Sequence, residues 1–341
     1  AVSLHINRSS YNGELALPYL APAVLSADSI SRGLIKVHEN IKHKAVMKKL
    51  TNSTEIVAAA SGACSFSATA GDLHLDETVL EITELKVNQE LCKNDFRADW
   101  EAYNMGRGAA NQSLPNQFEA FLIQFLAGKV QENIEKSIWG GNFDPTDSDG
   151  GTSYVTTSFD GLMHHIVDAN ASLGYDDEAA GAMTADDDAT TGVITRLDKV
   201  VKNAPSAILN SLESKIYMSR KSAYLLQRAL GGFVTSTTGT GSATSTAAQG
   251  LADPGVLTGS VPLSFMGFDI VVPQGCPDDT IVFTHPENLH FGCDLFTDQT
   301  SVNVVDMAKT DGSDTVRFAM RFGGGTQIGF AGDISVSRRI S

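Results

Sequence analysis

The stretch that decides the fold is residues 115–139, PNQFEAFLIQFLAGKVQENIEKSIW. Its apolar residues recur mostly at intervals of three and four, the spacing that places side chains on one stripe of an α-helix. The stripe consists of Phe118, Phe121, Leu122, Phe125, Leu126, Val130, Ile134 and Ile138. Because Pro115 suits a first helical turn and Gly140-Gly141 a helix end, the sequence predicts one helix over 115–139, about 37 Å long. The periodicity fits a core helix of any α/β protein and a special architectural helix equally well.

The segments before this helix carry too little apolar surface to fold alone. Residues 1–50 open with polar residues and two prolines and become weakly helical over Ser29 to Leu50, which predicts an extended arm and a short helix. From Glu55 to Leu85, small and β-favouring residues alternate around a break at Gly71-Asp72, which predicts a long two-stranded hairpin. A lone two-stranded ribbon is marginally stable in water, so we expect this hairpin to rest on a neighbouring molecule.

The segments after the long helix predict a mixed α/β lobe followed by strands. The elements expected in the lobe are helices at Phe159 to Ala169 and Val193 to Asn203, a strand at Ser214 to Ser219, and a helix from the capping Ser219 to Leu230. Residues 235–250 are almost entirely Gly, Ser, Thr and Ala, which predicts a mobile loop. Later strand-like runs, many separated by glycine turns, predict one long closing antiparallel sheet; they cover 268–272, 280–283, 302–305, 316–322 and 327–336.

Charge and composition exclude several classes of protein. The chain has 341 residues, and 25 Lys and Arg against 40 Asp and Glu give a formal net charge of −15 at pH 7, which argues against a free nucleic-acid binder. Basic residues gather in 32–49 and acidic ones in 144–149 and 186–188, so one copy can attract another; solvated loops and a solvated helix face are the alternative interpretation. No window reaches the ~20 apolar residues of a membrane span, and the prolines near residue 20 disfavour an export signal.

The sequence contains no motif with the residue types and spacing that a known catalytic or metal-binding site requires. The four cysteines are scattered, without Cys-x-x-Cys pairs, so we expect reduced thiols and neither a zinc site nor a disulfide framework. Asp147-Ser148-Asp149-Gly150 resembles part of a calcium loop, but Pro145 and Thr156 stand where carboxylate ligands should be. His164-His165 cannot ligate one metal from a helix, since adjacent residues point about 100° apart.

The glycine-rich and acidic motifs have simpler explanations. Gly323-Gly324-Gly325 lacks the Lys-Ser/Thr of a phosphate-binding loop and fits a turn between strands, and Gly239-Thr240-Gly241 fits a flexible loop. The acidic runs 176–178 and 186–188 lie in polar loop sequence, where carboxylates keep ordinary acidity. No nucleophile elbow and no His-Glu-x-x-His helix occurs. We therefore predict no catalytic, cofactor-binding or metal-binding residue, no cofactor, and a protein that is not an enzyme.

Three local motifs surround the long helix. They are Lys86-Val87-Asn88-Gln89-Glu90-Leu91-Cys92 before it, Glu132-x-x-Glu135-x-x-Ile138-Trp139-x-Gly141 at its end, and Phe159-Asp160-Gly161-Leu162 after it. Together with the order of the elements, they resemble the major capsid proteins of tailed bacteriophages, in particular those of crAss-like and other phages that infect Bacteroidetes. The resemblance covers nearly the whole chain.

The resemblance implies an α+β fold of the Hong Kong 97 type. The expected parts are an N-terminal arm (1–50), an extended β-hairpin or E-loop (51–86), a peripheral domain with the spine helix (87–157), an α/β axial domain (158–295), and the antiparallel C-terminal strands of the peripheral domain (296–341).

The same resemblance implies a virion protein that assembles in the host cytoplasm. It predicts hexamers and pentamers in an icosahedral head around double-stranded DNA, which is held only non-specifically. The partners implied are neighbouring capsomers and portal, scaffold and decoration proteins, with no membrane.

Two departures from the family pattern matter. Residues 55–85 contain no lysine, so we predict no covalent crosslink through the hairpin. No scaffolding-like coiled region precedes the arm, which is compatible with protease removal, with a separate scaffold, or with loss of methionine only.

Three other functions remain possible from the sequence. An encapsulin-type compartment shell would share the fold and enclose cargo enzyme in place of DNA. A soluble enzyme with an unrecognised site would form a small oligomer, and an adhesin or tail component would favour all-β structure, which the long helix disfavours.

Overall fold

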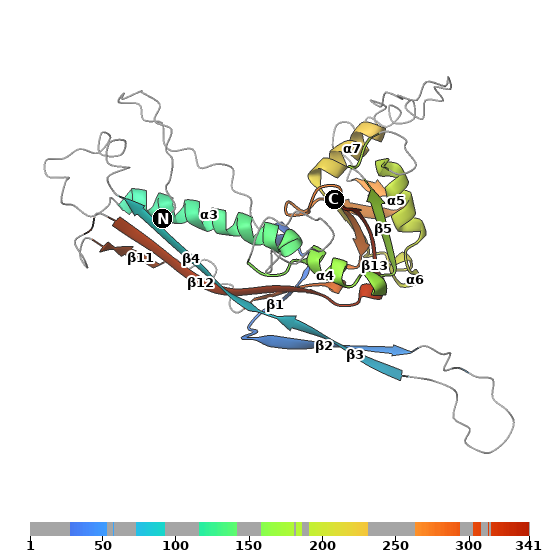
Figure 1. The fold of residues 1–341 in the computed structure, drawn as a ribbon, viewed down its shortest axis with the longest axis horizontal. Coiled ribbons are helices and arrows are strands. Elements are labelled where there is room, and N and C mark those ends of the chain that lie inside the picture. The colour runs from blue at the N-terminus through green and yellow to red at the C-terminus, as the bar shows by residue number, and fades with distance from the viewer. Residues whose placement is uncertain are drawn as a thin grey trace, which may run out of the picture.

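The computed structural model describes residues 28–52, 57, 73–92, 116–141, 158–180, 182–185, 191–230, 263–293, 303–307, 313 and 315–340. In these residues a long helix runs over one sheet, a second lobe stands at one end of that sheet, and a β-hairpin projects below it (Figure 1). The arm before residue 28, the loop at 235–250 and most of 53–72 lie outside the described residues.

The first sheet is organised around one long strand, β12. Its strands are β1 (Lys36–His38), β4 (Thr83–Cys92), β10 (Leu289–Cys293), β11 (Asn303–Asp306) and β12 (Thr315–Ile328). On one edge β12 pairs antiparallel with β4 along ten residues; on the other it pairs with β11 and then β10, to which β1 adds in parallel. Every residue of β12 is paired on at least one edge, and residues 316–319 and Gly324 are paired on both, so β12 is the central element of this sheet.

The predicted helix is confirmed as α3 (Asn116–Gly140), which runs over the first sheet (Figure 1). Val130, Ile134 and Ile138 of the predicted stripe are buried and share a core with residues of β1, β10 and β12. The side chains of the other stripe members, Phe118, Phe121, Leu122, Phe125 and Leu126, lie outside the described part. The short helix α4 (Leu162–Asp168) and the turn η2 (Asn170–Ser172) follow.

The second lobe contains the predicted mixed α/β elements. Its sheet has the order β5-β13-β9-β6-β8-β7, formed by β5 (Tyr175–Ala180), β6 (Lys215–Met218), β7 (Ser264–Phe265), β8 (Phe268–Val271), β9 (Ile281–Thr284) and β13 (Ile334–Ile340). Its helices are α5 (Val193–Lys202), α6 (Ser206–Leu209) and α7 (Arg220–Leu230). The predicted cap of α7 is present, because the Ser219 hydroxyl accepts the backbone N–H of Ser222 at 3.1 Å.

The expected helix before residue 50 is wrong. After the single turn α1 (Asp28–Ser31), the chain forms β1 and then β2 (Lys44–Asn52), which pairs antiparallel with β3 (Leu73–Glu81). Lysines of β2 face glutamates of β3, Lys44 with Glu81 at 2.9 Å and Lys48 with Glu77 at 3.5 Å, and such cross-strand charge pairs favour the ribbon. The hairpin therefore begins at residue 44, and the expected limit at residue 50 runs through β2.

The expected single closing sheet is also wrong. The strands after residue 261 divide between the two sheets, and two of the pairings in the second lobe, β6 with β8 and β5 with β13, are parallel. The sheets also cross the expected limit at residue 295, since β10 and β12 share the first sheet while β9 and β13 share the second. The pattern of strands along a sequence does not reveal which sheet each strand joins.

Gly323-Gly324-Gly325 does not form the expected turn but lies inside β12. A Cβ atom on Gly325 would lie 2.1 Å from the carbonyl oxygen of Glu81, so the glycine lets the connection from β3 to β4 pass directly against β12. The run of glycines thus serves a close backbone approach and not a chain reversal.

At two short crossings the chain passes directly between the two sheets, and one side chain joins both of them. The crossings are η3 (Pro286–Asn288), which leads from β9 to β10, and η5 (Ala331–Asp333), which leads from β12 to β13. The amide of Asn288, which is 7% exposed, donates to the carbonyl oxygens of Phe330 (2.9 Å) and Asp333 (3.3 Å) and accepts the N–H of Phe330 at 2.7 Å. We call this contact the Asn288 junction.

We predict that Asn288→Asp destabilises the fold strongly, because a carboxylate oxygen would replace the amide nitrogen against two carbonyl oxygens. The free energy of unfolding, measured by urea denaturation at pH 7, should fall by about 3 kcal/mol. Asn210→Asp, at an exposed position, should change it by no more than about 0.5 kcal/mol. Equal unfolding midpoints for the two variants would contradict the junction's role.

Candidate functional site

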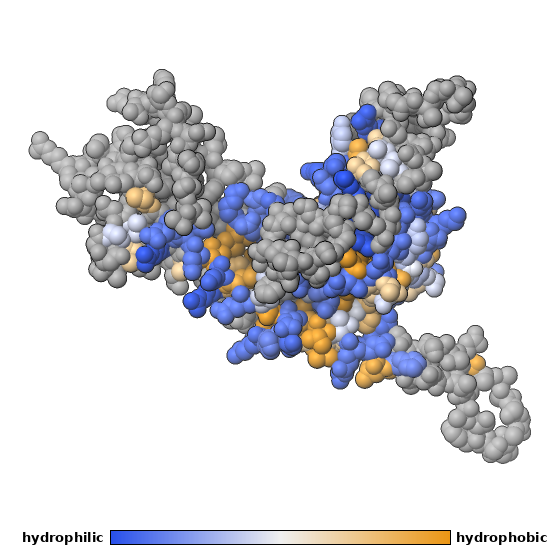
Figure 2. All heavy atoms as spheres, viewed as in Figure 1, coloured by the Kyte–Doolittle hydropathy of each residue, from blue (hydrophilic) through white to orange (hydrophobic). Residues whose placement is uncertain are grey.

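The hairpin of β2 and β3 carries an apolar stripe on one face. Val46, Leu50, Leu75 and Val79 are 51%, 65%, 57% and 42% exposed, respectively. Val46 lies opposite Val79 and Leu50 opposite Leu75, with the Lys48–Glu77 ion pair between the two apolar pairs. We call these four residues the hairpin stripe. Figure 2 shows hydrophobic patches among hydrophilic residues in this region.

The opposite face of the hairpin is docked on the same molecule. Leu80 is fully buried in contact with the Gly292 backbone, and the Thr78 hydroxyl donates to the carbonyl oxygen of Gly329 at 3.1 Å. The Lys49 ammonium lies 3.2 Å from the Asp333 carboxylate and 3.8 Å from the centre of the Phe330 ring. The base of the hairpin thus rests on its own chain, at the Asn288 junction, and leaves the stripe bare.

The acidic residues of the motif at the end of α3 have structural roles. Glu132 accepts hydrogen bonds from Lys129 (2.6 Å) and Lys136 (2.7 Å), which lower its pKa to about 2. Glu135 is buried, which raises its pKa, and it accepts the Ser29 hydroxyl at 2.6 Å and the Ser29 N–H at 3.2 Å. These contacts attach α1 to the long helix.

The other residues of the second motif pack with those of the third motif, Phe159-Asp160-Gly161-Leu162, around the end of α3. Trp139 is fully buried and donates its indole N–H to the Ser29 hydroxyl at 2.8 Å. Gly161 donates its N–H to the carbonyl oxygen of Gly141 at 2.9 Å, and a Cβ atom on Gly141 would lie 2.2 Å from the carbonyl oxygen of Phe159. These motif residues therefore hold the core together at the end of α3.

The candidate metal and acid/base residues are dispersed or paired. His164 lies between the carboxylates of Asp160 (3.7 Å) and Asp168 (3.4 Å), and burial lowers the pKa of His165. The described residues contain no group of three or more His, Cys, Asp or Glu that could hold a metal ion.

The acidic run 176–178 lies on β5 and not in the expected loop. Asp176 pairs with Arg338 at 3.0 Å, and Asp177 lies 3.8 Å from Lys199. The candidates at 144–150, 186–188 and 239–241 lie outside the described residues.

A histidine pair lies where β1 meets β10. His38 Nε2 and His290 Nδ1 are 3.0 Å apart, and the ring centroids are 5.0 Å apart. Burial, with His38 and Lys36 nearby, lowers the pKa of His290 to about 4; burial and Lys36 also lower the pKa of His38. The pair is therefore neutral in the folded protein at pH 7 and shares one hydrogen bond.

We predict that this pair makes the fold sensitive to acid. An unfolded histidine takes up a proton near pH 6.5, whereas folded His290 stays neutral to about pH 4, so stability is full above pH 6.5 and is lost as the pH falls towards 4. His290 alone accounts for at most about 3 kcal/mol of that loss. The free energy of unfolding is measured by urea denaturation at pH 7 and at pH 4.5. His290→Gln should make the difference between the two values smaller, whereas the exposed control His43→Gln should leave this difference unchanged.

Comparisons with known proteins identify the fold. No protein-family model matches the sequence, and no curated protein does. Among solved structures, the capsid of a native GTA particle superposes with a TM-score of 0.57 at 15% identity over 99% of this chain and 100% of that chain. The chain has the Hong Kong 97-type capsid fold.

Other structures with this fold agree. A chain of Mycobacterium phage Adephagia has a TM-score of 0.54 at 11% identity over 97% of this chain and 98% of its own. A chain of the satellite phage P4 procapsid with size determination (Sid) protein has a TM-score of 0.54 at 8% identity, over 90% of this chain and 86% of its own. The predicted α+β capsid fold is thereby confirmed. In the described part, no helix is long and apolar enough to cross a membrane.

Proposed function

We propose that the protein is the major capsid protein of a tailed bacteriophage. It assembles as hexamers and pentamers into an icosahedral head around double-stranded DNA and acts as a structural protein, not as an enzyme. The capsid fold supports this proposal, and the observation that carries it is the hairpin stripe, a row of aliphatic side chains bare in the single chain although the opposite face of the same ribbon is docked.

The energetics favour a neighbouring copy as the cover for the stripe. Complete burial of one aliphatic side chain stabilises a contact by roughly 1.5–3 kcal/mol, so four half-exposed residues supply a few kcal/mol to each contact. One such contact is weak. A closed shell repeats it once for every subunit, and symmetric repetition makes the whole stable.

Further parts of the proposal rest on the family resemblance. On that basis we propose the domain limits after residues 86 and 157, kinship with crAss-like and other Bacteroidetes phages, and assembly in the host cytoplasm. The portal, scaffold and decoration proteins are proposed as partners on the same basis. The net charge of −15 supports only non-specific contact with packaged DNA, because an acidic shell repels the phosphate backbone.

We expect substitution in the hairpin stripe to stop assembly without unfolding the subunit. Leu75→Asp places a charge where a neighbour's apolar surface should pack, so particle yield should fall at least tenfold in electron micrographs of the expressed protein. The matched control is Met266→Asp, which is 62% exposed on the turn between β7 and β8. Both variants should keep the wild-type unfolding midpoint.

Two outcomes would contradict parts of this proposal. A Leu75→Asp variant that forms particles at the wild-type yield would show that the stripe is not an assembly contact. Particles from the native source that enclose protein cargo and lack nucleic-acid absorbance would favour an encapsulin-type shell, an alternative that the acidic net charge supports.

The lysines of the hairpin bear on covalent crosslinking. The prediction of no crosslink rests on the absence of lysine from residues 55–85. The hairpin begins earlier, however, and its strand β2 contains Lys44, Lys48 and Lys49. Each of these lysines is ion-paired, with Glu81, Glu77 and Asp333 respectively. Each ion pair holds the lysine against its own chain, so the side chain must leave its carboxylate before it can reach an amide of a neighbouring copy.

We therefore expect the shell to be held without covalent links. Purified particles boiled in detergent should run as a single band at the subunit mass of 36.2 kDa on a denaturing gel. A ladder of multiples of this mass that disappears in the triple variant Lys44→Arg, Lys48→Arg, Lys49→Arg would contradict the prediction.

A further inference from the structure

A loop of the second lobe presents a fully exposed leucine. Leu212, between α6 and β6, is 98% exposed, and its neighbour Leu209 is 37% exposed. The loop is nevertheless held in place, since the Ser214 hydroxyl donates to the carbonyl oxygen of Ile208 at 2.9 Å and the Ser211 N–H donates to the same oxygen at 3.2 Å. We call residues 209–214 the Leu212 loop. Because it is already ordered, binding through Leu212 would cost little conformational entropy.

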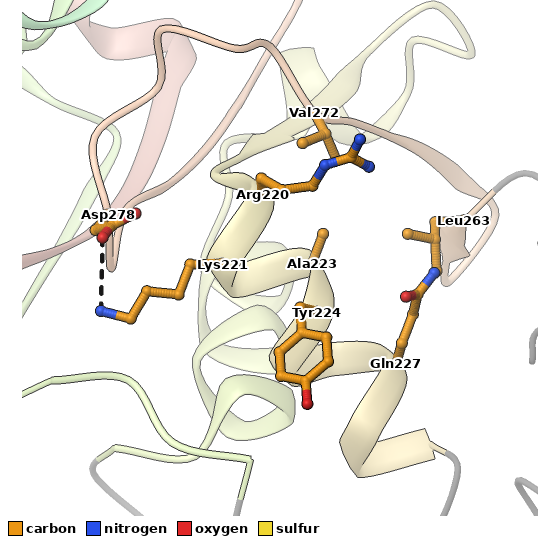
Figure 3. A pocket seen from close by; sticks show the side chains of 8 residues that line it. All are labelled: Arg220, Lys221, Ala223, Tyr224, Gln227, Leu263, Val272 and Asp278. Atoms are coloured by element: carbon orange, nitrogen blue, oxygen red, sulfur yellow. Dashed lines mark ion pairs between the residues drawn. The ribbon is translucent and has the colours of Figure 1, made fainter. Parts of the chain in front are cut away.

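A pocket lies beside α7 in the same lobe (Figure 3). It is an open hollow of about 640 Å³ between α7 and the segments that flank β7 and β8. Its lining residues are Arg220, Lys221, Ala223, Tyr224, Gln227, Leu263, Val272 and Asp278. Tyr224 is 60% exposed and, with Leu263 and Val272, gives the pocket an apolar lining. We call it the α7 pocket.

The charges at the pocket and on the loop are opposite. Lys221 is shared between Asp278 and Asp279, each at 3.6 Å, whereas the Arg220 side chain makes no hydrogen bond or ion pair with any residue that the structure describes. On the loop, Glu213 follows the exposed leucine directly and is 81% exposed, with His285 at 3.2 Å. An apolar side chain next to a carboxylate thus matches an apolar pocket next to an available guanidinium.

The loop and the pocket of one molecule cannot meet. The Leu212 loop precedes β6 and α7 follows it, so the strand separates them by about 13 Å at 3.3 Å per residue. Figure 1 shows α6 and α7 at opposite ends of the lobe. A surface that fits a different surface of the same chain forms head-to-tail contacts between copies, and these close into rings when the rotation allows.

We propose that the Leu212 loop of one copy inserts into the α7 pocket of the next copy in a ring. Leu212 packs against Tyr224, Leu263 and Val272 of the neighbouring molecule, and Glu213 pairs with the neighbour's Arg220. This inference rests on the proposed function, since it names one contact by which the second lobes join within a capsomer. It is separate from the hairpin stripe, which belongs to another part of the molecule.

A charge-swap experiment on the full chain tests the contact. Leu212→Asp, Arg220→Glu and Glu213→Arg should each lower the yield of closed particles, measured by electron microscopy and analytical ultracentrifugation, at least tenfold. The double variant Arg220→Glu with Glu213→Arg should restore at least half of the wild-type yield, because the ion pair is rebuilt with reversed polarity. All four should keep the wild-type unfolding midpoint, since the substituted side chains are exposed.

The outcomes separate this inference from the proposed function. If wild-type protein forms neither rings nor closed particles, the proposed function fails. If wild-type protein and all three single variants assemble equally, only the loop-and-pocket contact is overturned. If Arg220→Glu blocks assembly but the charge swap does not rescue it, the pocket binds something other than the Leu212 loop, and the inference is likewise overturned.

Discussion

The structure depends on one buried amide, that of Asn288, which joins the two short crossings between its sheets. Its hydrogen bonds hold η3 and η5 together, so the sheets can change their relative orientation only if several buried polar groups lose their partners. The hairpin is attached to the same point through Lys49 and Thr78. One junction therefore sets the positions of the first sheet, the second lobe and the hairpin.

That junction explains why the hairpin presents an apolar face. Adjacent residues of a strand point to opposite faces, so docking Leu80, Thr78 and Lys49 on the body turns the hairpin stripe away from it. The hairpin is thus displayed with a defined orientation, as an assembly contact requires. The second lobe presents the Leu212 loop and the α7 pocket in the same way, each on a backbone ordered by its own hydrogen bonds.

Much of the fold was predictable from local patterns, and the failures share one cause. The helical segment that forms α3, the Ser219 cap and the strand-helix order of the second lobe are local features, and all three are correct. The lysines before residue 50 were misinterpreted because their glutamate partners are more than 25 residues away along the chain. Gly325 was assigned to a turn because nothing in its sequence neighbourhood indicates that Glu81 passes against it.

By itself the sequence determined the order of elements, the long helix and a family resemblance that the fold comparison supports. Only the tertiary structure decided which strands share a sheet, which face of the hairpin is bare, and that the motif residues Glu135, Trp139 and Gly161 pack the core. The physical reason is distance along the chain. Periodicity and caps act within one turn or one strand, whereas exposure, ion pairs and the Asn288 amide depend on segments that meet only after folding.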